Sequence, residues 1–165
     1  MRILTTIALL LFANTAIARD LAMPEGDVLL TVTGAIENTN ANGVAVFDRE
    51  MIEALAQRDT TTKTPWFDSA RTFSGPLGHA LLDAVGASGK TLRIYALNEY
   101  SADVPAQDFR SHAVILATHI DGEVIRVREK GPLFLIYPFD EAPELFNEVY
   151  FGRSVWQIAR IEVID

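Results

Sequence analysis

The chain has 165 residues, with 22 acidic against 14 basic residues, 49% hydrophobic residues and no cysteine. This composition is typical of a globular protein and excludes fibrous and disulfide-stapled classes. The net charge of −8 argues against binding nucleic acid or an anionic membrane over a broad surface, and leaves room only for a local basic pocket. Without cysteine, the chain has no thiolate to ligate a metal and no thiol nucleophile.

The first residues have the pattern of an export signal. Arg2 precedes an apolar run from Ile7 to Ala13, and Ala16-Ile17-Ala18 has the small-x-small form that a signal peptidase cleaves. We therefore expect residues 1–18 to be a signal peptide that is cleaved after Ala18, and residues 19–165 to form a single domain in a bacterial periplasm. No other segment is apolar over the roughly 20 residues that span a bilayer, so we expect no membrane insertion after cleavage.

Short periodic segments in the first half predict one strand and two helices. The expected elements are a strand over residues 28–32, a turn over residues 38–43, a short helix after Asp48 and a longer helix between about Pro76 and Gly86. Residues 28–32 are apolar and β-branched, Asp48 is a typical N-cap, and Gly86 supplies a left-handed stop. The polar residues 58–64 are left without a predicted element.

The second half reads mainly as strands. The expected strands cover residues 92–97, 113–117, 124–127, 133–137 and 155–163, with a tight turn at Asp121-Gly122. The first alternates in polarity, and the second is continuously apolar. The whole chain therefore predicts an α+β fold in which a sheet dominates residues 92–163 and the helices precede it.

The common catalytic motifs give no support for a hydrolase or a nucleotide-binding enzyme. The chain has three histidines, His79, His112 and His119. No pair of them has the spacing of a helical zinc site. The sequence contains no G-x-S-x-G elbow, no P-loop and no G-x-G-x-x-G motif.

A basic cluster is unusual in so acidic a chain. Arg126, Arg128 and Lys130 lie within five residues of one another. These charges either prevent a solvent-exposed strand edge from pairing with another chain or bind a ligand, and the two interpretations explain the cluster equally well. At this stage both interpretations stay open.

The two tryptophans also have two interpretations. Trp66 and Trp156 are either core residues or walls for a flat heteroaromatic ligand, for which Arg153 and Ser154 beside Trp156 offer guanidinium and hydroxyl donors. A third polar and aromatic segment is Asn98-Glu99-Tyr100.

Several short motifs occur along residues 27–163 in a distinctive order. They are Trp66, Phe73-Ser74-Gly75-Pro76-Leu77, Asn98-Glu99-Tyr100, Leu116-Ala117, Asp121-Gly122, Gly131-Pro132-Leu133, Tyr137-Pro138 and Arg153-Ser154-Val155-Trp156 with Ile161. In this order and spacing the set resembles the molybdopterin-binding domain of the sulfite oxidase family. The resemblance implies the α+β sulfite oxidase-like fold, with mixed β-sheets and short flanking helices.

The chain departs from the catalytic members of that family at the metal ligand. In those members a cysteine four residues before the tryptophan ligates molybdenum, and here Thr62 takes that place. A threonine hydroxyl is too weakly acidic to replace a thiolate as a soft ligand. Phe134 also stands where catalytic members often carry a basic residue. We therefore expect no enzyme activity and no molybdenum.

The combination of export signal, short length and missing cysteine resembles the small periplasmic pterin-binding proteins of this fold. That resemblance implies a protein that binds a reduced pterin, such as a tetrahydropterin, without molybdenum. It also implies a partner, the periplasmic domain of an inner-membrane diguanylate cyclase or phosphodiesterase for cyclic di-GMP. Two alternatives remain: a molybdopterin-dependent oxidoreductase or its cofactor-binding subunit, and a structural module without a ligand.

A pterin is a flat ring with apolar faces and a polar edge, so it needs aromatic walls and a few fixed polar groups. Trp66, Tyr100 and Trp156 are the expected walls. We expect Arg153 and Ser154 to bind the ring carbonyl and nitrogens, and Glu99 to pair with the amino edge. The full set of candidate pterin-binding residues is Thr62, Trp66, Glu99, Tyr100, Lys130, Arg153, Ser154 and Trp156.

Overall fold

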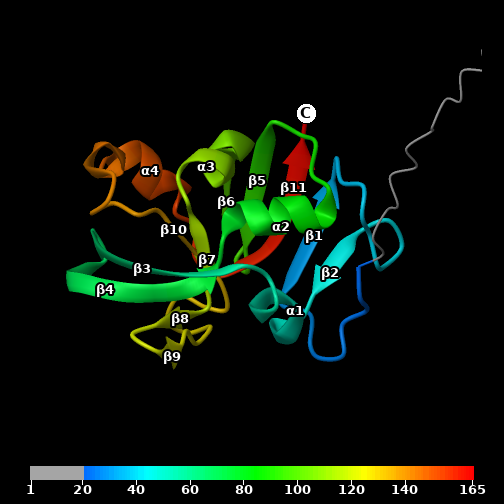
Figure 1. Cartoon of the computed structure of the whole chain (residues 1–165), viewed down its shortest axis with the longest axis horizontal. Helices are drawn as coiled ribbons and strands as arrows, with labels where there is room; N and C mark the ends of the chain where they lie inside the picture. Colours follow the sequence, from blue (N-terminus) through cyan, green and yellow to red (C-terminus); the bar gives the residue numbers. More distant parts are fainter. Residues whose placement is uncertain (1–20) are drawn as a thin grey trace, which may run out of the picture.

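The computed structural model describes residues 21–165 (Figure 1). The expected signal peptide, residues 1–18 with its cleavage site after Ala18, lies outside the described residues. Among the residues described, no helix combines the length and the apolar character needed to cross a membrane.

Strands predominate, and the helices are short. The strands are β1 (Leu30–Gly34), β2 (Ala45–Phe47), β3 (Gln57–Thr64), β4 (Phe67–Pro76), β5 (Thr91–Ala96), β6 (Ser101–Pro105), β7 (Ile115–Ala117), β8 (His119–Ile120), β9 (Glu123–Val124), β10 (Phe134–Ile136) and β11 (Ile158–Ile164). The helices are α1 (Arg49–Glu53), α2 (Gly78–Val85), α3 (Ala106–Ser111) and α4 (Glu148–Arg153), with a 3-10 turn, η1, at Pro143–Leu145. This is the α+β class expected from the sequence.

The larger core lies on a five-stranded sheet of order β2-β1-β11-β5-β6. Strands β1 and β11 are parallel, and all other neighbours in this sheet are antiparallel. In the register of the sheet, Ile161 pairs with Val32 on one side and with Ile94 on the other, and all three side chains are fully buried. Figure 1 shows α2 across this sheet, where Leu81 and Leu82 join the same core.

A second layer contains the four-stranded sheet β3-β4-β8-β9 and the β10-β7 pair. Phe73 of β4, Ile115 of β7 and Phe134 of β10 form part of a smaller buried cluster between these strands. The long β3–β4 hairpin extends away from the five-stranded sheet, toward the side where α4 lies in Figure 1. This arrangement brings the β3–β4 turn near the C-terminal third of the chain.

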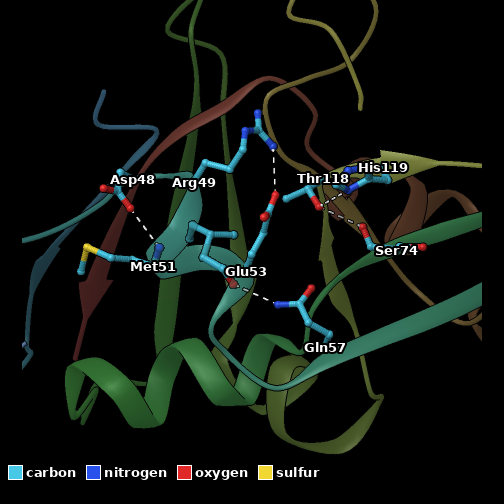
Figure 2. Close-up of polar contacts among 9 residues, drawn as sticks. Asp48, Arg49, Met51, Glu53, Gln57, Ser74, Thr118 and His119 are labelled. Atoms are coloured by element: carbon cyan, nitrogen blue, oxygen red, sulfur yellow. Dashed lines mark hydrogen bonds and ion pairs between the residues drawn. The ribbon is translucent and has the colours of Figure 1, made fainter. Parts of the chain in front are cut away.

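The first helix begins where the sequence predicts it. The Asp48 carboxylate accepts a hydrogen bond from the backbone N–H of Met51 at 2.9 Å, as an N-cap does. Gln57 at the start of β3 donates to the carbonyl of Ile52 at 2.9 Å, which joins the helix exit to the hairpin (Figure 2). Hydrogen bonds to backbone N–H groups also hold the pKa of Asp48 below its ordinary value.

The β3–β4 hairpin is the largest element that the sequence analysis missed. Its inward-facing residues on β3 are Thr60, Thr62 and Thr64, which are buried although they are polar. A strand is predicted from the alternation of apolar and polar residues. Because threonine is polar, the buried positions of β3 do not stand out in the sequence, although threonine favours extended backbone.

The expected strand over residues 124–127 is wrong beyond Val124. The carbonyl of Arg126 accepts hydrogen bonds from the N–H groups of Glu129, Lys130 and Gly131, so the chain turns tightly instead of continuing. The basic cluster therefore lies in a turn rather than on a strand edge. The expected restriction of helices to the first half is also wrong, because α3, η1 and α4 lie within residues 106–153.

The strand at residues 155–163 starts later than expected, at Ile158. Trp156 makes only an isolated bridge to Phe134. The turn at Asp121-Gly122 is confirmed, with both residues at positive φ. Next to it, His119 contacts the Thr118 hydroxyl, which also lies near the Ser74 carbonyl (Figure 2).

Gly75 illustrates how closely β4 approaches β7. A Cβ at this position would collide with the carbonyl oxygen of Leu116 and lie 2.8 Å from the Cα of Ala117. Both contacts are backbone, which does not yield easily. We expect Gly75→Ala to lower the free energy of unfolding by about 2 kcal/mol in chemical denaturation. Gly152→Ala is the control, because nothing lies within 4 Å of its added Cβ; equal stability of the two variants would contradict the prediction.

Candidate functional site

A cavity of about 460 Å³ opens between the β3–β4 turn, the β5–β6 turn and α4 with the segment that follows it. Four of the residues that line it are candidates from the sequence: Trp66, Tyr100, Ser154 and Trp156. The others are Ala96, Asn98, Glu148, Phe151, Gly152 and Val155. The volume falls within the range of small-molecule sites, and the lining combines aromatic rings with a few polar groups.

The aromatic wall is a set of rings that meet edge to face. The Trp66 ring lies 5.9 Å from the Trp156 ring and 5.3 Å from the Phe134 ring, and the Trp156 and Phe134 rings are 6.1 Å apart. Interplanar angles of 63° to 90° are the arrangement that aromatic quadrupoles favour. Trp156 is still 38% exposed, so one part of its ring is free to contact a ligand.

Lys130 adds a cation to this wall without lining the cavity itself. Its Nζ lies 4.0 Å from the Trp156 ring centre, 5.6 Å from that of Phe134 and 6.0 Å from that of Trp66. Within residues 21–165, no carboxylate forms an ion pair with it. Burial lowers the pKa of the Lys130 amine from its ordinary value of 10.5. Lys130 instead lines a neighbouring hollow that includes Phe67 and Arg71.

The tryptophans allow this cation to be observed directly. The chain has only two tryptophans, and Lys130 lies beside both. Deprotonation of the amine removes a charge from the indole faces, so we expect the intrinsic fluorescence to titrate with a midpoint below 10.5. Lys130→Met should abolish this transition. A transition that persists in Lys130→Met would assign the titration to another group.

Arg153 is held away from the cavity by a buried network. Its Nη1 donates to Asp108 Oδ2 at 2.9 Å, and the same oxygen accepts from the Tyr137 hydroxyl at 2.7 Å. The guanidinium also lies 5.1 Å from the Tyr150 ring centre. Burial and the Asp108 carboxylate raise the pKa of Tyr137 far above its ordinary value, so its proton stays in this hydrogen bond.

Ser154 and Tyr100 line the cavity from opposite elements. The Ser154 hydroxyl donates to the Tyr150 carbonyl at 2.8 Å and caps α4, and the side chain is nearly fully buried. Tyr100 is 54% exposed, and its N–H donates to the Asn98 side chain at 3.1 Å. The Ser154 hydroxyl is therefore fixed before a ligand binds, whereas for Tyr100 the contact holds only the backbone.

Thr62 and Glu99 lie outside the cavity lining. The buried Thr62 hydroxyl accepts a hydrogen bond from the Asp140 N–H at 3.0 Å and donates to the Lys63 carbonyl at 3.2 Å. Glu99 stands in the β5–β6 turn with positive φ, and its side chain is 82% exposed at 3.9 Å from Arg160. The cavity therefore brings together four of the eight candidates; Lys130 contacts its wall from outside.

Glu148, Phe151 and Gly152 are lining residues that the sequence analysis did not select. All three belong to α4, an element that apolar periodicity did not reveal because none of its residues is buried. The available signal was Asn147, which caps this helix by accepting from the Val149 N–H at 3.0 Å.

The donor set does not fit molybdenum held through a protein thiolate. The chain has no cysteine, and the hydroxyl of Thr62 is already engaged by backbone groups. Over residues 21–165 no three His, Asp or Glu side chains gather as a metal site. The aromatic wall and the few polar groups do fit a flat heteroaromatic ring.

The fold is similar to that of solved structures, among them a sulfane dehydrogenase. The sulfane dehydrogenase SoxCD from Paracoccus pantotrophus contains a chain that superposes with a TM-score of 0.62 over 90% of this chain, at 17% identity. The chain spans 40% of the length of that protein chain. No family profile and no curated protein matches the sequence. The similarity supports the expected α+β, sulfite oxidase-like fold.

Proposed function

We propose that the protein binds a pterin in the cavity between Trp66, Tyr100 and Trp156 and has no catalytic activity of its own. The observation that carries this proposal is the cavity itself, where a half-exposed Trp156 stands in an aromatic wall beside a few fixed polar groups. Its volume of about 460 Å³ leaves room for a bicyclic ring.

The proposed ligand is a reduced pterin, such as a tetrahydropterin, without molybdenum. The lack of cysteine supports this part, because no thiolate is present to ligate the metal. Thr62, which stands in the place of that ligand, has its hydroxyl turned to the Asp140 backbone.

We further propose that pterin occupancy is reported to a partner, the periplasmic domain of an inner-membrane enzyme that makes or degrades cyclic di-GMP. This part follows from the family resemblance and from the proposed export to the periplasm. Such a sensor requires that the ligand favour one partner-binding state over another. The cavity is suited to this coupling, because a ligand there would bridge the β3–β4 turn, the β5–β6 turn and α4.

A second candidate function is that of a molybdopterin-dependent oxidoreductase or its cofactor-binding subunit. The observation that favours it is the fold shared with a sulfane dehydrogenase. This candidate requires an unusual ligation of the metal, since neither a thiolate nor a three-residue ligand cluster is present within residues 21–165.

The experiment that decides between them starts from the protein purified from its native cells. The protein is denatured, and the released molecules are identified by fluorescence and mass spectrometry together with elemental analysis for molybdenum. Pterin without metal is the expected result. Stoichiometric molybdenum with a pterin dithiolene would support the oxidoreductase. A protein that is empty and ignores added reduced pterins would overturn both.

A further inference from the structure

One carboxylate in the cavity has no partner inside the described chain. Glu148 is the only charged residue among those lining the cavity. Within residues 21–165 its carboxylate takes part in no ion pair, although seven pairs form elsewhere. The other lining residues are apolar or neutral. This negative charge therefore favours a ligand that places hydrogen-bond donors or a positive charge beside Glu148.

The position of Glu148 is fixed from both ends of α4. Before it, Asn147 accepts from the Val149 N–H at 3.0 Å and donates to the Glu144 carbonyl at 2.9 Å. At the other end, Arg153 is tied to the buried Asp108 at 2.9 Å. These contacts hold the backbone of α4, and with it the Cα of Glu148, in place, while Glu148 itself is an exposed residue of the cavity lining.

We infer that Glu148 is the residue that recognises the amino edge of the pterin, the 2-amino group together with N3–H. This inference rests on the proposed function and deepens it. The edge carries two parallel N–H donors, and a carboxylate offers two acceptor oxygens at matching spacing. Glu99, the residue selected for this role from sequence, instead lies outside the cavity lining, 3.9 Å from Arg160.

The inference also predicts how the ring lies. With its amino edge at Glu148 on α4, the ring extends toward Trp156 and Trp66, which line the same cavity. The aromatic wall accepts any flat ring, so it supplies affinity with little discrimination. Glu148 supplies the discrimination, because a carbonyl in place of the 2-amino group would face the carboxylate with a lone pair.

The test compares pterin with lumazine, the same ring with a carbonyl at position 2, as matched oxidised and matched reduced pairs. Binding is followed by quenching of the two tryptophans and by calorimetry. The wild-type protein should prefer pterin by about tenfold or more, as expected for a charge-assisted hydrogen bond. Glu148→Gln should lose this preference while its affinity for lumazine does not fall.

Glu144→Gln is the matched control, since it removes the same charge four residues earlier in the chain, in the 3-10 turn η1 and outside the cavity lining. It should keep the wild-type preference. A Glu148→Gln variant that still prefers pterin as the wild type does would overturn the inference and leave the proposed function standing, as would a Glu99→Gln variant that alone loses the preference. A wild-type protein that binds neither ring would overturn the proposed function itself.

Discussion

Trp156→Ala should abolish measurable pterin binding at micromolar concentrations while the protein stays folded. The substitution removes the half-exposed ring of the cavity wall and, with it, the surface on which a flat ligand stacks. Stacking on an aromatic side chain is worth about 1–3 kcal/mol, and the indole N–H and the shape of the wall are lost as well, so we expect a loss of about 100-fold. Isothermal calorimetry with a tetrahydropterin measures it.

Tyr95→Ala is the matched control for Trp156→Ala. Tyr95 is also a partly exposed aromatic residue beside a cation, with the Arg160 guanidinium 3.5 Å from its ring centre, but it lies outside the cavity lining. This variant should bind the pterin like the wild type. An unchanged affinity in Trp156→Ala, with a normal circular dichroism spectrum, would contradict the proposed site.

Asp108→Ala should cause the largest loss of stability among the charged positions. One oxygen of Asp108 accepts from both Tyr137 and Arg153, and its side chain is 8% exposed. Removing it leaves a buried hydroxyl and a largely buried guanidinium without their acceptor. We expect a decrease in the free energy of unfolding of about 3 kcal/mol in urea denaturation.

The same variant should also weaken pterin binding, because Arg153 loses the contact that anchors the end of α4.

Asp83→Ala is the control for stability, since it breaks an exposed ion pair with Arg110 at 3.1 Å. Exposed pairs contribute little, so this variant should lose about 0.5 kcal/mol or less. If Asp108→Ala and Asp83→Ala were equally stable, the network would not stabilise the fold as we argue.

Local patterns were sufficient for several elements of the fold. The alternation in residues 92–97 predicted β5 (Thr91–Ala96) within one residue at each end, and Asp48 predicted the start of α1. Such signals depend only on neighbours along the chain. The β3–β4 hairpin was not predicted from the sequence. Its threonines are polar, and they are buried because β3 pairs and packs with other strands, not because of their own hydrophobicity.

The same distinction applies to the site. Trp66, Tyr100, Ser154 and Trp156 were selected from sequence and line one cavity, because their residue types suit a flat ligand and their segments meet. Arg153 and Thr62 were selected for the same reason, but they have competing partners. Asp108 lies 45 positions from Arg153, and Asp140 lies 78 positions from Thr62.

The sequence by itself determined which chemistry the chain lacks. Without cysteine it has no thiolate for molybdenum, and no arrangement of the remaining residues supplies one. Only the tertiary structure decided which polar groups remain available to a ligand. Hydrogen bonds between sequence-distant residues occupy Arg153 and Thr62 and leave the Glu148 carboxylate on the cavity wall, because each polar group binds the partner that folding brings nearest.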